Sequence, residues 1–251
     1  VRAGPDPGLP GEGSGGIGKT HAWHGGRTGY GFPRSGSEKP LVCRWTTRHH
    51  PRAMERSLFF DQLAAEDDPL AIKPEHEPRM EQLRRRLGDL QGKRVFEPGC
   101  GAGPLTRRLA EWVGPYGRVL ALDPCEGMTA RCERAVNGHG HVEVRRGRAE
   151  DAVLEEKAWD LVLCFRLYPH LDNPVKFVQQ CRRWLAPEGE LVVANLEGSA
   201  SLNALHAELH GVHNDRMPSG DRLAALLAEQ GWRVAEAVDA PEEYFVRARP
   251  D

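Results

Sequence analysis

Three glycines at alternate positions, directly after a short apolar segment, constrain this 251-residue chain more than any other feature. The run reads R-V-F-E-P-G-C-G-A-G over residues 94–103. It is followed by Pro104, which suits a first helical position, and by Leu105, Leu109 and Val113 near helical spacing. A strand that turns this tightly into a helix needs residues without a Cβ, because the backbone must bend and approach a ligand closely. The pattern therefore predicts a strand-loop-helix unit with a ligand-binding loop.

The acidic residue before the glycines indicates the charge of that ligand. A dinucleotide fingerprint would read G-x-G-x-x-G, with the pyrophosphate at the helix N-terminus. Here the pattern is E-x-G-x-G-x-G, and Glu97 precedes the first glycine by two residues. A carboxylate at this position would repel a pyrophosphate but suits an ammonium or sulfonium group. The loop therefore predicts a site for S-adenosylmethionine.

Residues 54–251 resemble a class I, Rossmann-like S-adenosylmethionine-dependent methyltransferase of the small-molecule type, broadly similar to the ubiquinone and menaquinone methyltransferases. Three further segments carry the resemblance. R-V-L-A-L-D at 118–123 resembles the family's second strand, W-D-L-V-L-C at 159–164 its fourth, and L-A-P-E-G-E-L-V-V at 185–193 the turn into its fifth. Each motif is weak alone, but four in the family's order over about 100 residues are specific.

The alternation of strand and helix patterns predicts the same α/β fold: a single doubly wound, seven-stranded, mostly parallel sheet with a Rossmann-like order. The expected strands lie near 93–97, 118–123, 141–145, 159–164 and 190–195. The expected helices lie near 78–90, 104–113, 126–136, 174–185 and 219–230. The tail, at 232–238 and 243–249, is expected to form two closing strands, which the family places at an antiparallel edge.

The first 53 residues differ in kind from the rest. They contain 12 Gly and 6 Pro, and 8 Lys and Arg against 3 Asp and Glu, which leaves 26 against 33 for residues 54–251. Such a segment cannot bury enough apolar surface to offset its ordering entropy, so we expect a disordered extension at 1–53 and a methyltransferase domain at 54–251. We hypothesise that the extension is not native, because residues 54–61 read like a natural start. A mass spectrum of the native protein beginning well before Met54 would contradict this.

One motif in the extension is expected to be inactive. Residues 13–20, G-S-G-G-I-G-K-T, fit the phosphate-binding P-loop pattern. That loop binds phosphate only between a buried strand and a helix, whereas three prolines precede this run and H-A-W-H-G-G follows it. We therefore expect no nucleotide site here.

Composition limits the compartment and the partners. No apolar stretch approaches the 18 or more residues of a membrane span. The six cysteines show no C-x-x-C spacing, which is typical of reduced thiols in the cytoplasm. The acidic domain argues against a nucleic-acid partner. We expect a cytoplasmic enzyme with a small-molecule methyl acceptor, and the sequence does not indicate an oligomeric state.

The resemblance implies where the cofactor is held. The loop residues Gly99, Cys100, Gly101 and Gly103 would lie along its methionine end, and the acid at 97 would face the ammonium group. The acid that ends the second strand, Asp123, followed by Pro124, would accept hydrogen bonds from the ribose diol. An alternative role for Asp123 is to cap the helix that follows it.

The adenine contact departs from the family pattern. Relatives often have Gly-Asp-Ala after the third strand, whereas residues 147–149 here read G-R-A. Ala149 would still offer its backbone N–H to the ring, and Glu150, or otherwise Asp151, would supply the acceptor. At the end of the fourth strand, Cys164 would also border the cofactor.

The segment after the fourth strand is expected to border the methyl group, because ligands bind outside the carboxyl ends of the strands. It reads C-F-R-L-Y-P-H over residues 164–170 and lacks the D/N-P-P-Y/F signature of base and amide methyltransferases. Tyr168 and His170 are the candidate catalytic residues, since either could orient a substrate or take its proton. The alternative is that His170 packs against or caps the helix that begins near Asn173.

A histidine-rich run at 202–215, L-N-A-L-H-A-E-L-H-G-V-H-N-D, is the most distinctive segment. His206 and His210 are four residues apart and would share a face of a helix. With His213, or with the histidine after the fourth strand, they could bind a metal. Methyl transfer needs no metal, so we expect a substrate-binding lid and no metal site. Phe59, in an N-terminal helix, would cover the same crevice.

The predicted function is transfer of a methyl group from S-adenosylmethionine to a small-molecule acceptor by in-line displacement. Three alternatives remain open. A protein or RNA methyltransferase would need a basic groove beside the site. A non-catalytic partner subunit would keep Asp123 but lack an acceptor pocket. A nicotinamide oxidoreductase is disfavoured by the loop spacing and by Glu97.

Overall fold

A computed structural model describes residues 51–67 and 70–251 of the chain. The P-loop-like run at 13–20 and most of the extension predicted at 1–53 lie outside the described residues. Residues 51–53 are the exception, because they form the first turn of helix α1, Pro51–Leu63.

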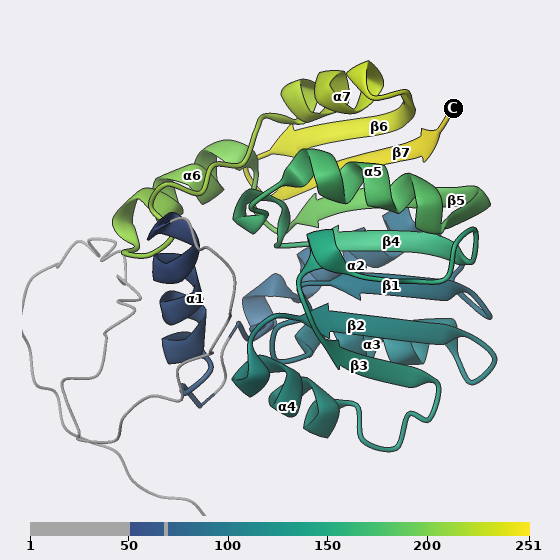
Figure 1. Cartoon of the computed structure of the whole chain (residues 1–251), viewed down its shortest axis with the longest axis horizontal. Helices are drawn as coiled ribbons and strands as arrows, with labels where there is room; N and C mark the ends of the chain where they lie inside the picture. Colours follow the sequence, from purple (N-terminus) through teal and green to yellow (C-terminus); the bar gives the residue numbers. More distant parts are fainter. Residues whose placement is uncertain (1–50, 68–69) are drawn as a thin grey trace, which may run out of the picture. The chain divides into compact units, whose positions relative to one another are not determined.

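Within the described residues, seven strands form one sheet in the order β3-β2-β1-β4-β5-β7-β6 (Figure 1). The strands are β1 Arg94–Pro98, β2 Arg118–Asp123, β3 Val142–Arg146, β4 Trp159–Phe165, β5 Leu185–Asn195, β6 Trp232–Ala240 and β7 Glu243–Pro250. Strands β1 to β5 are parallel, whereas β7 is antiparallel to both β5 and β6. The predicted doubly wound sheet with an antiparallel edge is therefore confirmed.

The helices begin and end close to the predicted limits. Besides α1 they are α2 Glu77–Leu87, α3 Pro104–Val113, α4 Glu126–Ala135, α5 Pro174–Trp184, α6 Ser199–Glu208 and α7 Gly220–Glu229, with short 3-10 turns η1 Pro74–His76, η2 Ala149–Asp151 and η3 Tyr168–His170. Helices α5 and α7 are capped by the side chains of Asn173 and Ser219, which accept the backbone N–H of Lys176 and Arg222. None of the described helices has both the length and the apolar character needed to cross a membrane.

Two differences from the predicted limits have local causes. The helix predicted at 78–90 ends at Leu87, where Gly88 follows as a C-terminal residue. Strand β5 begins at Leu185 rather than near 190, because Leu185 already pairs with Trp159 before the register shifts ahead of Leu161.

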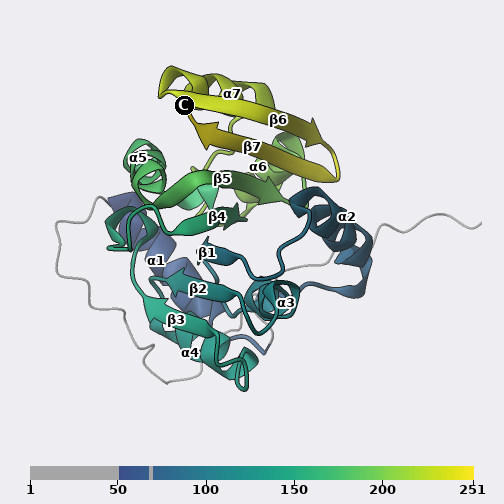
Figure 2. The ribbon, with the colours of Figure 1, turned by 90° about the vertical axis from the view of Figure 1, so that its right-hand side faces the viewer.

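Helices cover both faces of the sheet, so the central strands are buried on both sides, as parallel sheets require. Helices α2 and α3 cover one face and α5 and α7 the other, and Figure 2 shows α5 on the opposite side of the sheet from α2 and α3. Adjacent residues of β1 point to the two cores: Val95 packs with the α2–α3 side and Phe96 with the α5–α7 side.

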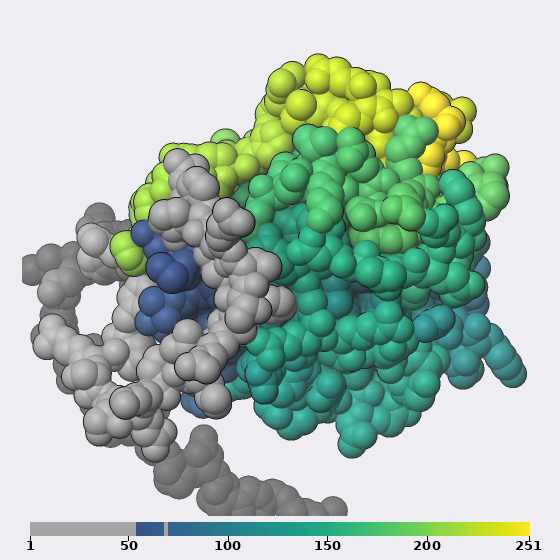
Figure 3. All heavy atoms as spheres, in the orientation of Figure 1, coloured from purple at the N-terminus to yellow at the C-terminus, as the bar shows by residue number. Residues whose placement is uncertain are grey.

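The carboxyl ends of β1 to β5 meet at one edge of the sheet, and α1 and α6 lie along this edge (Figure 1). Helix α1 packs Leu63 and Ala64 against Cys125 and Met128 of the β2–α4 segment. The segments around α1 and α6 lie side by side in Figure 3, and an added methyl group at Gly211 would approach the Cβ atom of Phe59 to 2.8 Å. The fold thus places a helical cover where an open α/β sheet binds its ligand.

Candidate active site

The glycine loop is held between two neighbouring strands. The backbone N–H groups of Gly99 and Cys100 both donate to the carbonyl oxygen of Leu122 on β2, at 2.6 and 3.0 Å. Gly99 has a φ of +74°, and a Cβ atom there would lie 2.8 Å from Cδ1 of Leu167. Only glycine fits this position without strain, because the backbone is left-handed and the turn after β4 packs directly on it.

Glu97 is a buried carboxylate at the end of β1, with 2% of its surface exposed. The hydroxyl of Thr106 on α3 donates to its Oε2 atom at 2.7 Å. Burial raises the pKa of Glu97 well above its ordinary value, and the Thr106 bond opposes this only in part. Among the described residues Oε1 accepts no hydrogen bond, so it keeps its acceptor capacity. A carboxylate of this kind fits a ligand cation, which would compensate for its lost hydration.

Asp123 ends β2 directly beside the loop. Its Oδ2 atom accepts the N–H of Gly101 at 3.0 Å, and Oδ1 accepts the N–H of Cys125 at 2.9 Å. Burial raises the pKa of Asp123 to about 6, although both N–H groups act in the opposite direction. The Cys125 contact orders the chain just before α4, but it is not the helix cap considered from the sequence, because the N-cap residue of α4 is Cys125 itself. Each oxygen keeps a second lone pair, so the predicted ribose contact is compatible with it.

The residues predicted on the adenine side lie in and near η2. Ala149 and Glu150 are both buried. Glu150 accepts the backbone N–H groups of Asp172 and Asn173 through Oε1, at 2.7 and 3.2 Å, and so fixes the loop that leads into α5. The neighbouring Asp151 instead pairs with Lys176 at 2.6 Å.

Pro124 and Cys164 lie in different surroundings. The exposed Pro124 offers its carbonyl oxygen to Nε of Arg146 at 3.3 Å. Cys164 is completely buried in the core on the α5–α7 face, and burial raises the pKa of its thiol. Their predicted cofactor contacts stay predictions, and for Cys164 any such contact would have to be made through the backbone at the end of the strand.

The two candidate catalytic residues of η3 are in different environments. Tyr168 is buried in the core on the α5–α7 face, and burial raises its pKa to about 12. A phenol with this pKa keeps its proton at neutral pH, which leaves an orienting role. His170 instead points its Nδ1 atom at Oδ2 of Asp215, at 2.7 Å.

Arg56 of α1 and Asp215 of the segment after α6 complete this cluster. Nε and Nη2 of Arg56 donate to the two carboxylate oxygens of Asp215, at 2.8 and 2.9 Å. Nη1 of Arg56 also donates to the carbonyl oxygen of His170, at 2.5 Å, and to Asp172, at 2.7 Å. Sequence reasoning missed both residues. They are 159 positions apart, and no spacing pattern indicates that they pair.

The histidine-rich segment does not form the predicted helical face. Helix α6 ends at Glu208, so His206 and His210 do not share a helix, and that prediction was wrong. His206 is buried and donates Nδ1–H to the carbonyl oxygen of Asp215 at 2.8 Å, with its ring 5.0 Å from that of His170. His210 instead stacks on His213, with ring centroids 6.0 Å apart.

Two other predictions concern the same region. Within residues 51–67 and 70–251, no three potential metal ligands are grouped as a metal site would need. Phe59 lies beside Gly211 on the cover, while its neighbour Phe60 places its ring edge-on to His170, at a centroid distance of 5.2 Å. The cover therefore contributes aromatic surface next to the candidate base.

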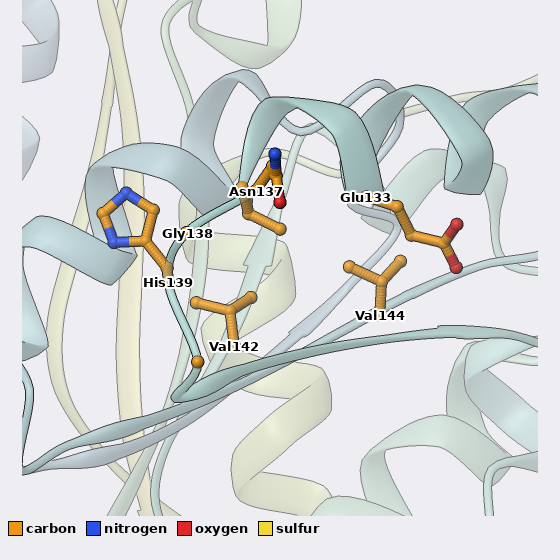
Figure 4. Close-up of a pocket in the computed structure, with 8 residues that line it drawn as sticks. Glu133, Asn137, Gly138, His139, Val142 and Val144 are labelled. Carbon is orange, nitrogen blue, oxygen red and sulfur yellow. The ribbon is translucent and has the colours of Figure 1, made fainter.

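A shallow pocket of about 410 Å³ lies elsewhere, at the turn between α4 and β3 (Figure 4). Glu133, Asn137, His139, Val142 and Val144 line it. This turn precedes β3, whereas the glycine loop and Asp123 follow their strands. The pocket is therefore at the opposite end of the sheet from the candidate site.

Comparison with known proteins agrees with this geometry. Residues 96–193 match the family model of a methyltransferase domain. A ubiquinone biosynthesis O-methyltransferase of Neisseria meningitidis serogroup C is 31% identical over 102 residues, which cover 40% of this chain and 43% of that protein. A malonyl-[acyl-carrier protein] O-methyltransferase of Halalkalibacterium halodurans is 29% identical over 130 residues, which cover 51% of this chain and 47% of the relative. The chain thus spans less than half the length of these curated relatives.

The solved structure of a DhpI–SAH complex superposes with a TM-score of 0.62 at 22% identity, over 81% of this chain and 98% of that chain. A likeness at this identity shows the fold alone. Residues 96–193 thus match a methyltransferase domain, and the chain is similar to the class I, Rossmann-like methyltransferases of the ubiquinone type, whose cofactor is S-adenosylmethionine.

Proposed function

We propose that this protein transfers a methyl group from S-adenosylmethionine to a small-molecule acceptor by in-line displacement. The observation that carries the proposal is the pair of buried carboxylates, Glu97 and Asp123, on either side of the glycine loop, each with acceptor capacity left for a ligand. The bound cofactor supplies a methyl group activated by a sulfonium. The protein's contribution is alignment of the acceptor and exclusion of water.

The chain's own residues then have separate tasks in this proposal. The Glu97 carboxylate holds the ammonium group, and Asp123 holds the ribose diol while its bonds to Gly101 and Cys125 keep it in place. The backbone of residues 99–103 lies along the methionine end. Ala149 and Glu150 border the adenine.

Several observations support a small acceptor. Helix α1 and the segment after α6 cover the edge of the sheet and bring Phe59 and Phe60 to the site. Residues 54–251 carry 26 Lys and Arg against 33 Asp and Glu, which does not favour a polyanionic substrate. The relatives are named as O-methyltransferases of ubiquinone biosynthesis and of malonyl-[acyl-carrier protein]. We infer an acceptor of metabolite size, free or attached to a carrier.

Calorimetric titration of S-adenosylhomocysteine into the full chain tests the proposal. We expect micromolar binding, weakened about tenfold or more in Asp123→Ala, because a hydrogen bond to a charged group contributes about 1.5–3 kcal/mol. Asp221→Ala is the matched control, since Asp221 is an exposed acid in the first turn of α7. A folded wild-type protein that releases no heat would overturn the proposal. Thermal protection by NAD instead would favour an oxidoreductase.

A further inference from the structure

We propose that His170 is the base that removes the acceptor's proton and that Asp215, itself held by Arg56, is the residue that positions it. This inference rests on the proposed methyl transfer. It also defines a class of acceptor: one whose nucleophile carries a proton to be lost, such as a hydroxyl group, rather than one already ionised at neutral pH.

The contact between Asp215 and His170 fixes which ring nitrogen carries the proton. A carboxylate only accepts, so the 2.7 Å contact requires a proton on Nδ1 of His170. Nε2 is then left with its lone pair. An imidazole oriented by an acid in this way is the arrangement by which enzymes prepare a general base.

The second ring nitrogen of His170, Nε2, has no partner of its own among the described residues. Within the part of the chain that the structure describes, this atom makes no hydrogen bond, because the ring is bonded only through Nδ1. The side chain of His170 is 12% exposed, so the ring is not fully enclosed. A lone pair that is unpaired on a partly exposed ring is what a proton acceptor needs.

Burial favours the neutral form of the base, and hydrogen bonds favour the ionised form of the acid. Burial opposes ionisation of Asp215, but the hydrogen bonds from His170 and Arg56 outweigh it and leave its pKa below the ordinary value. Burial lowers the pKa of His170, Asp215 opposes this, and the neighbouring His206 ring and Arg56 guanidinium lower the pKa further. The groups facing His170 therefore come from α1, from α6 and from the segment after α6.

The turn of His170 is also tied to the cofactor side of the site. Its N–H donates to the carbonyl oxygen of Leu167 at 2.8 Å, and the Leu167 side chain packs on Gly99. Two residues further on, the N–H of Asp172 donates to Glu150. The base thus sits on a short turn that contacts the glycine loop at one end and the adenine-side turn at the other.

The proton and electrons balance in the following way. The acceptor oxygen forms its bond to the methyl carbon, while its O–H bond breaks and the proton moves to Nε2 of His170. The electron pair of the broken sulfur–carbon bond stays on sulfur, which becomes a neutral thioether. Asp215 stabilises the imidazolium that results, and solvent later removes its proton.

Nitrogen NMR of the histidine rings in the full chain tests the inference without an acceptor. In the wild type we expect His170 to be neutral at pH 7 with its proton on Nδ1. Asp215→Asn should lower the pKa of His170 by about one unit, because a stabilising charge is lost, whereas Arg56→Gln should raise it. If Asp215 and Arg56 only held the structure together, replacing them would not shift the pKa of His170 in opposite directions.

Two controls keep the outcomes separate. Arg131→Gln removes another tether of this region, since Arg131 donates to the carbonyl oxygen of Asp67 at 3.0 Å, and it should leave the His170 ring unchanged. Binding of S-adenosylhomocysteine should be intact in Asp215→Asn. The inference is wrong if S-adenosylhomocysteine binds but the NMR spectrum places the proton of His170 on Nε2. It is also wrong if S-adenosylhomocysteine binds and neither variant changes the pKa of His170. Loss of binding by the wild type overturns the proposed function instead.

A kinetic measurement extends the test, with catechol as the probe acceptor. If the wild type methylates it, His170→Ala should lower kcat by about 100-fold or more at pH 7, and added imidazole should restore part of the rate. Asp215→Asn should lower kcat and displace its pH profile, with little change in KM. An unaltered profile in an active Asp215→Asn variant would contradict the positioning role.

Discussion

Asp123 and Glu97 are two buried acids with little to neutralise them, and this makes ligand binding sensitive to pH. With the pKa of Asp123 at about 6, the carboxylate that would accept from the ribose is mostly protonated at pH 5. We expect the affinity for S-adenosylhomocysteine to fall about tenfold between pH 7.5 and pH 5, because only the ionised acid can accept both ribose hydrogen bonds. Calorimetry across this range measures it.

The sign of the stability effect separates this result from unfolding. A raised pKa means that folded Asp123 binds its proton more tightly than the unfolded chain does, so its contribution to stability is larger below pH 4 and is lost as the pH rises through about 6. Weak binding at pH 5 would therefore not result from a loss of protein stability caused by Asp123. The pH dependence of S-adenosylhomocysteine affinity, centred near pH 6, should persist in Glu97→Gln and vanish in Asp123→Asn. If it persists in Asp123→Asn, another group causes it.

Gly99 tests close packing of the loop, and Gly138 is its matched control. Both are left-handed, with φ of +74° and +93°, but an added Cβ meets Leu167 at 2.8 Å in the first case and nothing within 4 Å in the second. Each alanine variant should lose about 1 kcal/mol of unfolding free energy through backbone strain. Only Gly99→Ala should also lose ligand affinity, by about tenfold, in calorimetry. Equal affinities in the two variants would show that the loop tolerates the displacement of Leu167.

At the scale of elements, most of the sheet and its helices could be predicted from the sequence. Strands β2 and β4 are nearly continuous apolar runs, because both faces of the central sheet are buried, whereas apolar residues recur near period 3.6 in the helices. The carboxylates at the ends of β1 and β2 could also be predicted, because they are adjacent in sequence to the loop that they serve.

The cover formed by α1, α6 and the segment after α6 was less predictable, because its contacts join residues that are far apart in the sequence. The histidine spacing at 206 and 210 indicated one helical face, but α6 ends at Glu208, where His206 turns inward to the carbonyl oxygen of Asp215. The contact between Arg56 and Asp215 is a tertiary pairing that leaves no periodic signal. Tertiary contacts of this kind orient the candidate base, His170. The part of the site that would bind the methyl acceptor was therefore predicted less well than the part that would bind the cofactor.

Helix α1 is attached through a small apolar cluster that is separate from the two cores of the sheet. Leu63→Ala should therefore loosen α1 locally, and hydrogen exchange of its amides should become faster while β1 and β4 stay protected. Leu58→Ala, on the same helix but 44% exposed, is the control and should change little. Faster exchange throughout the sheet would show instead that α1 unfolds together with the cores.

At the scale of the whole molecule, both cores, the α1 cluster and the Arg56–Asp215 contact are formed by residues of the segment 51–251. We therefore expect a chain of residues 51–251 to keep the melting temperature and the ligand affinity of the full protein. The truncation begins at Pro51 rather than Met54, because removal of the first turn of α1 would weaken the helix that carries Arg56.

The stabilisation by a bound ligand sets the size of the melting-temperature shift expected for the full and shortened chains. A ligand that binds only the native state at 100 times its Kd adds about 2.7 kcal/mol of stability, which raises the melting temperature of a domain of this size by about 5–11 °C. S-adenosylhomocysteine should produce this shift equally in the full and shortened chains, measured by calorimetric melting, and should produce little in Asp123→Ala. A smaller shift in the shortened chain alone would mean that residues 1–50 contribute to the cofactor site, and the domain boundary proposed here would have to move toward the N-terminus.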